Sequence, residues 1–370
     1  MRTEPPTPAR PPSPVHRLGR ADLGKCGLAI VVGTTGGAIF NYLDLPLPWM
    51  MGSMFAAGMV ALAGAELKMD TRLRTLMILV IGTLLGSAFS PEILERIPRW
   101  PITLASLAVF VIVSTWAAYI FYRVFAKFDP RTAFFSAVPG GLNEMILLGE
   151  AAGGDERQIS IAHTTRIFFV VMILPFLFRV FGDLGTTVRT FGGSDVGTIG
   201  PTDVAILTGC AVVGYFIARL ARIPAPHITG PMIFSATVHL AGFTEASPPA
   251  IIVAIAQIVL GSSIGARFIG LTFRDMGRIV RIGGIATVIL LAIAVLFGLV
   301  LNALASFPFT SLILAFSPGG LTEMSLIALT LDIDTAFVAT HHIARISVIV
   351  IVVPIVFRLL VRFGLLGPPP

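Results

Sequence analysis

The sequence predicts an all-α protein that crosses a membrane several times. The 370-residue chain is 55% hydrophobic and only 12% charged, and its mean hydropathy is +0.90. Soluble domains carry about 25% charged residues, so this composition cannot cover a water-facing surface of comparable size. Apolar stretches of about 17–25 residues, long enough to cross a bilayer as helices, recur along the chain. The composition therefore disfavours soluble enzymes and disordered proteins, and the lipid bilayer is the first predicted partner.

Ten apolar stretches predict membrane spans, because a helix satisfies its own backbone hydrogen bonds inside a bilayer. A basic, proline-rich and disordered tail over residues 1–22 precedes them, and a short tail over 363–370 follows. Two further apolar segments, 132–150 and 311–330, are interrupted by Pro-Gly-Gly and predict broken helices. The predicted spans cover residues 24–42, 46–65, 75–90, 101–125, 157–181, 203–220, 224–242, 250–268, 279–303 and 336–360.

The chain contains an internal repeat at an offset of 178–179 residues. Pro139-Gly-Gly-Leu-Asn-Glu-Met145 aligns with Pro318-Gly-Gly-Leu-Thr-Glu-Met324, and the same register continues to the following Asp, His, Arg and Pro residues. Such a sustained register predicts two homologous membrane repeats, over 23–181 and 203–362, joined by a linker over 182–202.

The distribution of Lys and Arg indicates the orientation of the repeats, because cytoplasmic loops carry the excess positive charge. We place the basic N-terminal tail in the cytoplasm. Six crossings per repeat then make the repeats parallel and give 15 Lys/Arg inside against nine outside. Five crossings with a re-entrant Pro-Gly-Gly segment make the repeats inverted and give 19 against four. The charges favour inverted repeats of about five spans and one broken segment each, an architecture typical of secondary transporters.

The Pro-Gly-Gly-Leu-x-Glu-Met segments form the sharpest functional pattern. Proline ends a helix, and the glycines allow unwound backbone next to a ligand. We expect Asn143 and Thr322 to cap a restarting helix, whose free N–H groups and positive dipole end attract an anion. Glu144 and Glu323 then either cap their own helices or act as protonatable or cation-binding carboxylates. The predicted ligand residues here are Gly140, Gly141, Asn143 and Glu144, with Gly319, Gly320, Thr322 and Glu323.

A histidine and an arginine lie three residues apart in each repeat, on one face of a helix. In one interpretation each arginine anchors a helix end or pairs with a nearby carboxylate. In the other, the arginines bind an anionic substrate while histidine and glutamate move protons. The pairs are His163 with Arg166 and His342 with Arg345. His341 stands where the first repeat has Ala162, so the repeats differ at this position.

Metal and cofactor chemistry has little support in the sequence. No H-x-x-x-H pattern and no Cys/His cluster at metal-ligand spacing occurs, and Cys26 and Cys210 both fall in apolar stretches. We therefore predict no catalytic residue, no metal and no cofactor.

With its twin motifs the sequence resembles the bacterial membrane family known as AbrB or AbrB duplication, over about residues 23–362. The resemblance implies a multi-pass protein of the bacterial inner membrane. Family members carry two labels, regulator of gene expression and ammonia monooxygenase. No segment of this chain looks like the small DNA-binding β-domain of the soluble AbrB regulator, and these residues supply no copper site for a monooxygenase.

Three functions follow, from three different classes. The first is a secondary transporter of a small polar or anionic solute, with proton coupling as an option. The second is a membrane-embedded regulator or sensor that binds a solute without moving it, and the third is a membrane oxidoreductase. The predicted partners are a small-molecule or ion ligand and a second copy of the chain in a homo-oligomer; nucleic acid is not among them.

Overall fold

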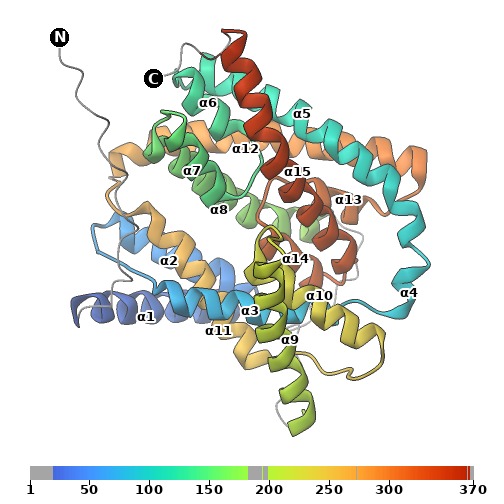
Figure 1. Cartoon of the computed structure of the whole chain (residues 1–370). Helices are drawn as coiled ribbons and strands as arrows, with labels where there is room; N and C mark the ends of the chain where they lie inside the picture. Colours follow the sequence, from blue (N-terminus) through green and yellow to red (C-terminus); the bar gives the residue numbers. More distant parts are fainter. Residues whose placement is uncertain (1–19, 182–193, 195–198, 272, 365, 367–370) are drawn as a thin grey trace, which may run out of the picture.

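The computed structural model of the protein describes residues 20–181, 194, 199–271, 273–364 and 366, and these are almost entirely helical (Figure 1). Their one β feature is an isolated bridge between Ser194 and Pro249. The prediction of an all-α protein is confirmed. The tail predicted over 1–22, the linker predicted over 182–202 and the tail predicted over 363–370 lie largely outside the described residues.

Long and short helices follow one another in a similar order in the two halves of the chain. The first half contains α1 (Arg20–Tyr42), α2 (Pro48–Leu62), α3 (Thr71–Ser87), α4 (Pro91–Leu94), α5 (Trp100–Val124), α6 (Pro130–Ala137), α7 (Leu142–Ala151) and α8 (Glu156–Phe181). The second half contains α9 (Pro201–Leu220), α10 (Pro226–Leu240), α11 (Ala250–Gly265), the 3₁₀ turn η3 (Ala266–Phe268), α12 (Phe273–Ala305), α13 (Phe309–Phe316), α14 (Leu321–Thr330) and α15 (Thr335–Arg362).

Seven helical segments among the described residues are long and apolar enough to cross a membrane. Two of the ten predicted spans form shorter helices than expected, namely α2 and α10, which have 15 residues each. α3, with 17 residues, is about as long as its predicted span over 75–90. Backbone turns cut α2 and α10 short at their starts: Leu47 before α2 and Ala225 before α10 adopt left-handed conformations, at φ 45° and 51°. These two residues are 178 positions apart, which matches the offset of the sequence repeat.

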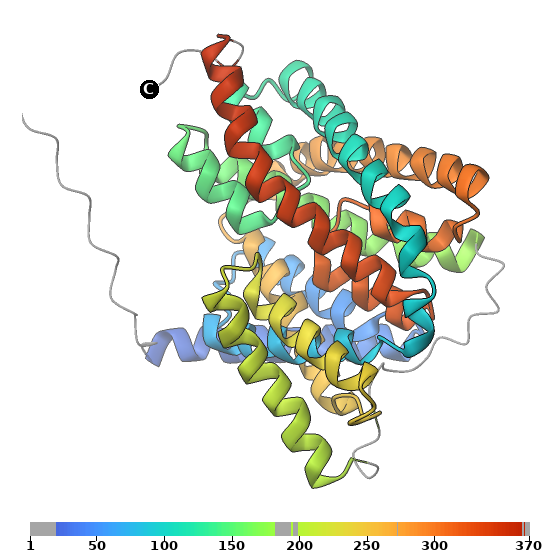
Figure 2. The ribbon, with the colours of Figure 1, turned by 45° about the vertical axis from the view of Figure 1, so that its right-hand side comes forward.

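The short helices lie between the halves and interlock them. α2 packs against α11, and α10 packs against α3, so each half contributes a helix to the other (Figure 2). Glycines allow these close approaches. A Cβ on Gly82 or Gly86 would meet backbone oxygens of α10, and one on Gly261 or Gly265 would meet backbone oxygens of α2. Small residues spaced four apart are typical of tightly packed membrane helices.

The first Pro-Gly-Gly segment turns back on itself. α6 and α7 are separated by the break at 138–141, and the end of α7 returns to the start of α6. Arg131 donates to the carbonyl oxygen of Ala152 at 3.1 Å, and the Asp155 amide donates to Thr132 Oγ1 at 2.8 Å. Both ends of this hairpin therefore lie on the same side of the molecule, which is the geometry of a re-entrant segment.

Polar contacts between distant loops define two opposite faces. Face A holds the start of α1, where Lys25 pairs with Glu66, and the loop where Arg157 donates to the Gly270 carbonyl oxygen at 3.1 Å. The Lys25 ammonium holds the pKa of the Glu66 carboxyl below its ordinary value. Face B holds the end of α1 and the turn before α5. Its contacts join Asp44 to Arg179, Arg96 to Asp334 and Arg99 to the Ala305 carbonyl.

Candidate functional site

The two helix breaks form the framework of the site. α6 ends at Ala137 and α7 begins at Leu142, while α13 ends at Phe316 and α14 begins at Leu321. The predicted caps are wrong by two residues: the N-caps are Gly141 and Gly320, both in extended conformation. The helix therefore restarts directly after the Gly-Gly pair in each half. Asn143 and Thr322 therefore lie inside the first turn.

Glu144 and Glu323 occupy the first turn of α7 and α14, as predicted. Each carboxyl group folds back over its own N-cap glycine, where a Cβ on Gly141 or Gly320 would collide with it. A carboxylate in this position stabilises the free N–H groups and the positive end of the helix dipole. The position of each carboxyl group is thus that of a helix cap. Proton or cation binding by these carboxylates stays a prediction.

A buried His–Arg pair contacts each break. In the first half, His163 Nε2 lies 2.8 Å from the carbonyl oxygen of Phe135, and Arg166 donates to that of Val138 at 3.3 Å. These carbonyls end α6 and lack intrahelical partners, so the pair satisfies acceptors that the break leaves open. Arg166 also lies 2.9 Å from His163 Nδ1, so both ring nitrogens of His163 have a partner.

The second half repeats this arrangement with more contacts. His342 Nε2 lies 2.9 Å from the Leu314 carbonyl oxygen and His342 Nδ1 lies 2.9 Å from Arg345. Arg345 donates to the carbonyl oxygens of Ser317 and Gly319, at 2.6 Å each. The contacts of the two pairs fall at the same offset along the chain, so a break and its His–Arg pair form one structural unit in each half.

Neither Arg166 nor Arg345 forms an ion pair with a carboxylate in the described part of the chain. Arg166 and Arg345 are 3% and 2% exposed, and the charge of Arg166 reaches Arg345. The four ion pairs between described residues all involve other groups. Each arginine also keeps an Nε atom that is buried without a hydrogen-bond partner. Two buried like charges are costly without a compensating negative charge.

A second polar cluster joins the two breaks and contains residues that the sequence analysis missed. Arg267 of η3 lies 3.5 Å from Oδ1 of Asn143, and the charges of Arg267 and Arg74 both reach Glu323. Arg74 also donates to Ser263 Oγ at 3.2 Å. Arg267 thus contacts the start of α7, and its charge and that of Arg74 act on Glu323 at the start of α14. The sequence indicated both arginines only as loop charges.

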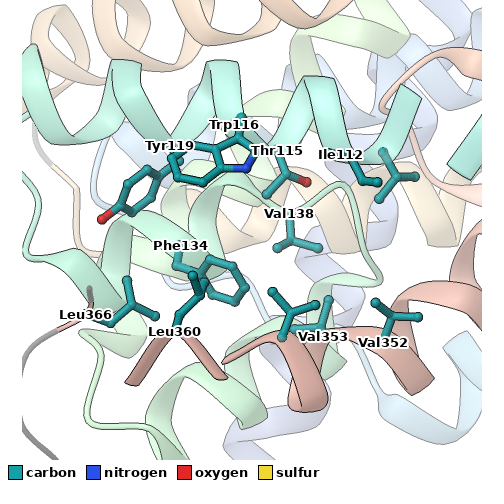
Figure 3. A pocket seen from close by; sticks show the side chains of 12 residues that line it. Ile112, Thr115, Trp116, Tyr119, Phe134, Val138, Val352, Val353, Leu360 and Leu366 are labelled. Atoms are coloured by element: carbon teal, nitrogen blue, oxygen red, sulfur yellow. The ribbon is translucent and has the colours of Figure 1, made fainter. Parts of the chain in front are cut away.

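An apolar groove of about 380 Å³ lies beside the first break (Figure 3). Trp116 and Thr115 of α5 face Val352 and Val353 of α15, and Val138 lies at the break itself. None of the twelve residues that line the groove is charged. A hydrocarbon chain fits such a lining, and a polar solute does not, so the groove is not where we place the charged ligand.

The described residues contain no group of three or more His, Cys, Asp or Glu side chains that could hold a metal ion. Of the predicted site residues, the structure brings each His–Arg pair to its own break and brings Asn143 and Glu323 to the cluster around Arg267.

Fold and site together define a class: a helical membrane protein with two broken segments, each held by a buried His–Arg pair. The chain belongs to the AbrB family, because the family model described as "Transition state regulatory protein AbrB" matches residues 49–361. The chain is similar to YhjN of Bacillus subtilis (strain 168), with 24% identity, covering 90% of this chain and 92% of YhjN. It is also similar to "Putative regulator AbrB" of Escherichia coli (strain K12), with 23% identity, covering 88% and 93% of the two chains.

Proposed function

We propose that the protein is a secondary transporter that moves a small anionic or zwitterionic solute across the bacterial inner membrane, with its N-terminus in the cytoplasm. The observation that carries this proposal is the pair of buried arginines, Arg166 and Arg345, at two helix breaks and without a carboxylate partner among the described residues. Broken helices at the interface of two repeats are where secondary transporters bind their substrates.

The contacts on faces A and B support inverted repeats, which the transport mechanism needs. Five crossings per half place Asp44 and Arg179 on the same side of the membrane, whereas six crossings place them on opposite sides. The two side chains form an ion pair at 3.6 Å. The same reasoning applies to Arg99 and Ala305, and to Arg131 and Ala152. Five crossings account for all three contacts, so they favour the inverted arrangement.

Proton coupling through Glu144 is the first part of the proposal to test. The purified protein is reconstituted in proteoliposomes and screened with labelled small carboxylates and amino acids, with and without a pH gradient. Glu144→Gln keeps the shape of the side chain and removes the titration, so we expect it to abolish gradient-driven uptake. Glu150→Gln, an exposed change on the same helix, should leave uptake unchanged. Full pH-dependent uptake by Glu144→Gln would exclude the coupling role.

A membrane-embedded regulator is the second candidate, and the name of the Escherichia coli relative, "Putative regulator AbrB", favours it. It would use the same arginines to bind a solute without moving it. Saturable binding to the purified protein, together with no flux in proteoliposomes for any bound solute, would support the regulator and contradict the transporter.

A further inference from the structure

A polar cavity of about 400 Å³ lies between α5, α8 and the first turns of α12, apart from the helix breaks. It opens on face A, where Arg157 and Arg278 line its mouth together with Asp155 and Asp275. Asp155 caps the start of α8, accepting from the Gln158 amide at 2.9 Å and from its side-chain nitrogen at 2.8 Å. A cavity of this size holds a small organic molecule.

The deep end of the cavity is built to bind an anion. Tyr122 and Thr165 line it, and both are buried. The Thr165 hydroxyl has no hydrogen-bond partner, although a buried hydroxyl normally has one. The charge of Arg166, the next residue along α8, reaches Tyr122. The deep end therefore combines a buried hydroxyl without a hydrogen-bond partner and, at the next position of α8, an arginine with no ion-pair partner among the described residues.

The equivalent place in the second half is filled. At the offset of 179 residues, Ala162 and Gln158 of the cavity correspond to His341 and Phe337. The centroids of these two rings lie 3.9 Å apart with the ring planes tilted by 38°, and His341 Nε2 lies 2.8 Å from Thr103 Oγ1. Trp100 and Phe307 pack on Phe337 at 5.7 and 5.6 Å. Thr165 corresponds to Ala344, so the second half also lacks the hydroxyl. The cavity is therefore not repeated at the equivalent place, and it opens on face A alone.

We infer that this one-sided cavity is the chamber that binds the charged group of a small organic anion, reached from the cytoplasm through face A. Tyr122 and Thr165 line the place of the anion, and Arg166 supplies the positive potential. That this anion is a transported solute rests on the proposed function. The chamber itself can be tested without any measurement of transport.

Cysteine labelling tests the chamber directly. In a background carrying Cys26→Ala and Cys210→Ala, Ala162→Cys places a thiol in the cavity. Its reaction rates are measured in inside-out vesicles with anionic sulfonatoethyl and cationic trimethylammonioethyl methanethiosulfonate, each normalised to a free thiol. We expect the anionic reagent to react at least about tenfold faster, since a single charge near a low-dielectric cavity has an effect of this order. Ala286→Cys, buried on α12 and not lining the cavity, should not react.

A matched pair of exposed arginines tests whether the mouth contributes to this preference. Arg278 lines the cavity and Arg281 lies on the same helix outside it. In the Ala162→Cys protein, Arg278→Gln should lower the anion-to-cation rate ratio several-fold, while Arg281→Gln should leave it unchanged. Equal effects of the two substitutions would contradict a role of the cavity mouth.

The outcomes separate this inference from the proposed function. Labelling of Ala162→Cys that is no faster than that of Ala286→Cys, or a normalised rate ratio near one, overturns the chamber even if uptake is later found. Anion-selective labelling with no flux in proteoliposomes supports the chamber and contradicts the transporter, which leaves a solute sensor.

Discussion

At the scale of single residues, the buried arginines have two roles that act in opposite directions. Their N–H groups satisfy carbonyl oxygens that the helix breaks expose, which stabilises the fold. Their charges form no ion pair with a carboxylate among the described residues, which costs free energy. A residue that is both a structural support and a source of positive potential cannot be removed without affecting both.

Arg345→Gln is therefore expected to lower stability. The change removes two donors to buried carbonyl oxygens, at a cost of about 2–4 kcal/mol, because these acceptors are then left without partners. Arg166→Gln should cost less, since Arg166 makes one such contact at 3.3 Å. Unfolding is followed in detergent with a thiol-reactive fluorophore, which reports the exposure of the buried Cys26 and Cys210.

Arg358→Gln serves as the control for this measurement. Arg358 lies on α15 like Arg345, but it is exposed and its contact is with its own helix. Its substitution should change stability by less than about 0.5 kcal/mol. A similar loss of stability in Arg358→Gln and Arg345→Gln would contradict a specific role of the breaks.

The sequence predicted the residues that occur twice and missed those that occur once. The His–Arg pairs and the two glutamates stood out because they recur at a fixed offset. Arg74 and Arg267 correspond to Val253 and Ala88 in the other half, so the repeat gives no signal for them. Their approach to Glu323 depends on how α3, η3 and α14 pack, and spacing along the chain does not contain that information.

At the scale of helices, apolar stretches and proline positions predicted both broken segments and the seven helical segments that are long enough to cross a membrane. The predicted lengths of α2 and α10 were too long. Both helices follow a residue with a left-handed backbone, Leu47 or Ala225, which is not glycine. Each of these residues precedes a proline, Pro48 or Pro226, which stands at the first position of the helix and starts it there.

Gly265→Ala should destabilise the contact between α11 and α2. The added methyl group would lie 2.5 Å from the Met54 carbonyl oxygen and 2.7 Å from the Gly58 nitrogen, so the backbones must separate. We expect a loss of about 1–3 kcal/mol, typical of overpacking. Gly209→Ala on α9 meets no atom within 4 Å. It should be neutral or stabilising by up to about 1 kcal/mol, as alanine favours helices. The opposite order of the two unfolding temperatures would contradict the proposed packing.

At the scale of the whole molecule, the two faces predict where the linker lies. A reporter that distinguishes cytoplasm from periplasm is inserted within 185–200, and a second copy is fused to the C-terminus. Inverted repeats place the linker in the periplasm and the C-terminus in the cytoplasm. A cytoplasmic linker would make the repeats parallel and would remove the main structural argument for alternating access.

The exchange of helices between the halves also has a consequence for biosynthesis. α3 is complete at Ser87, but its partner α10 begins at Pro226. At about 5–20 residues per second, a ribosome needs roughly 7–28 s to make the intervening chain. During that interval the glycine-lined face of α3 has no partner in the bilayer. A chaperone, an insertase or surrounding lipid must therefore cover this face of the newly inserted first half until α10 is made and packs against α3.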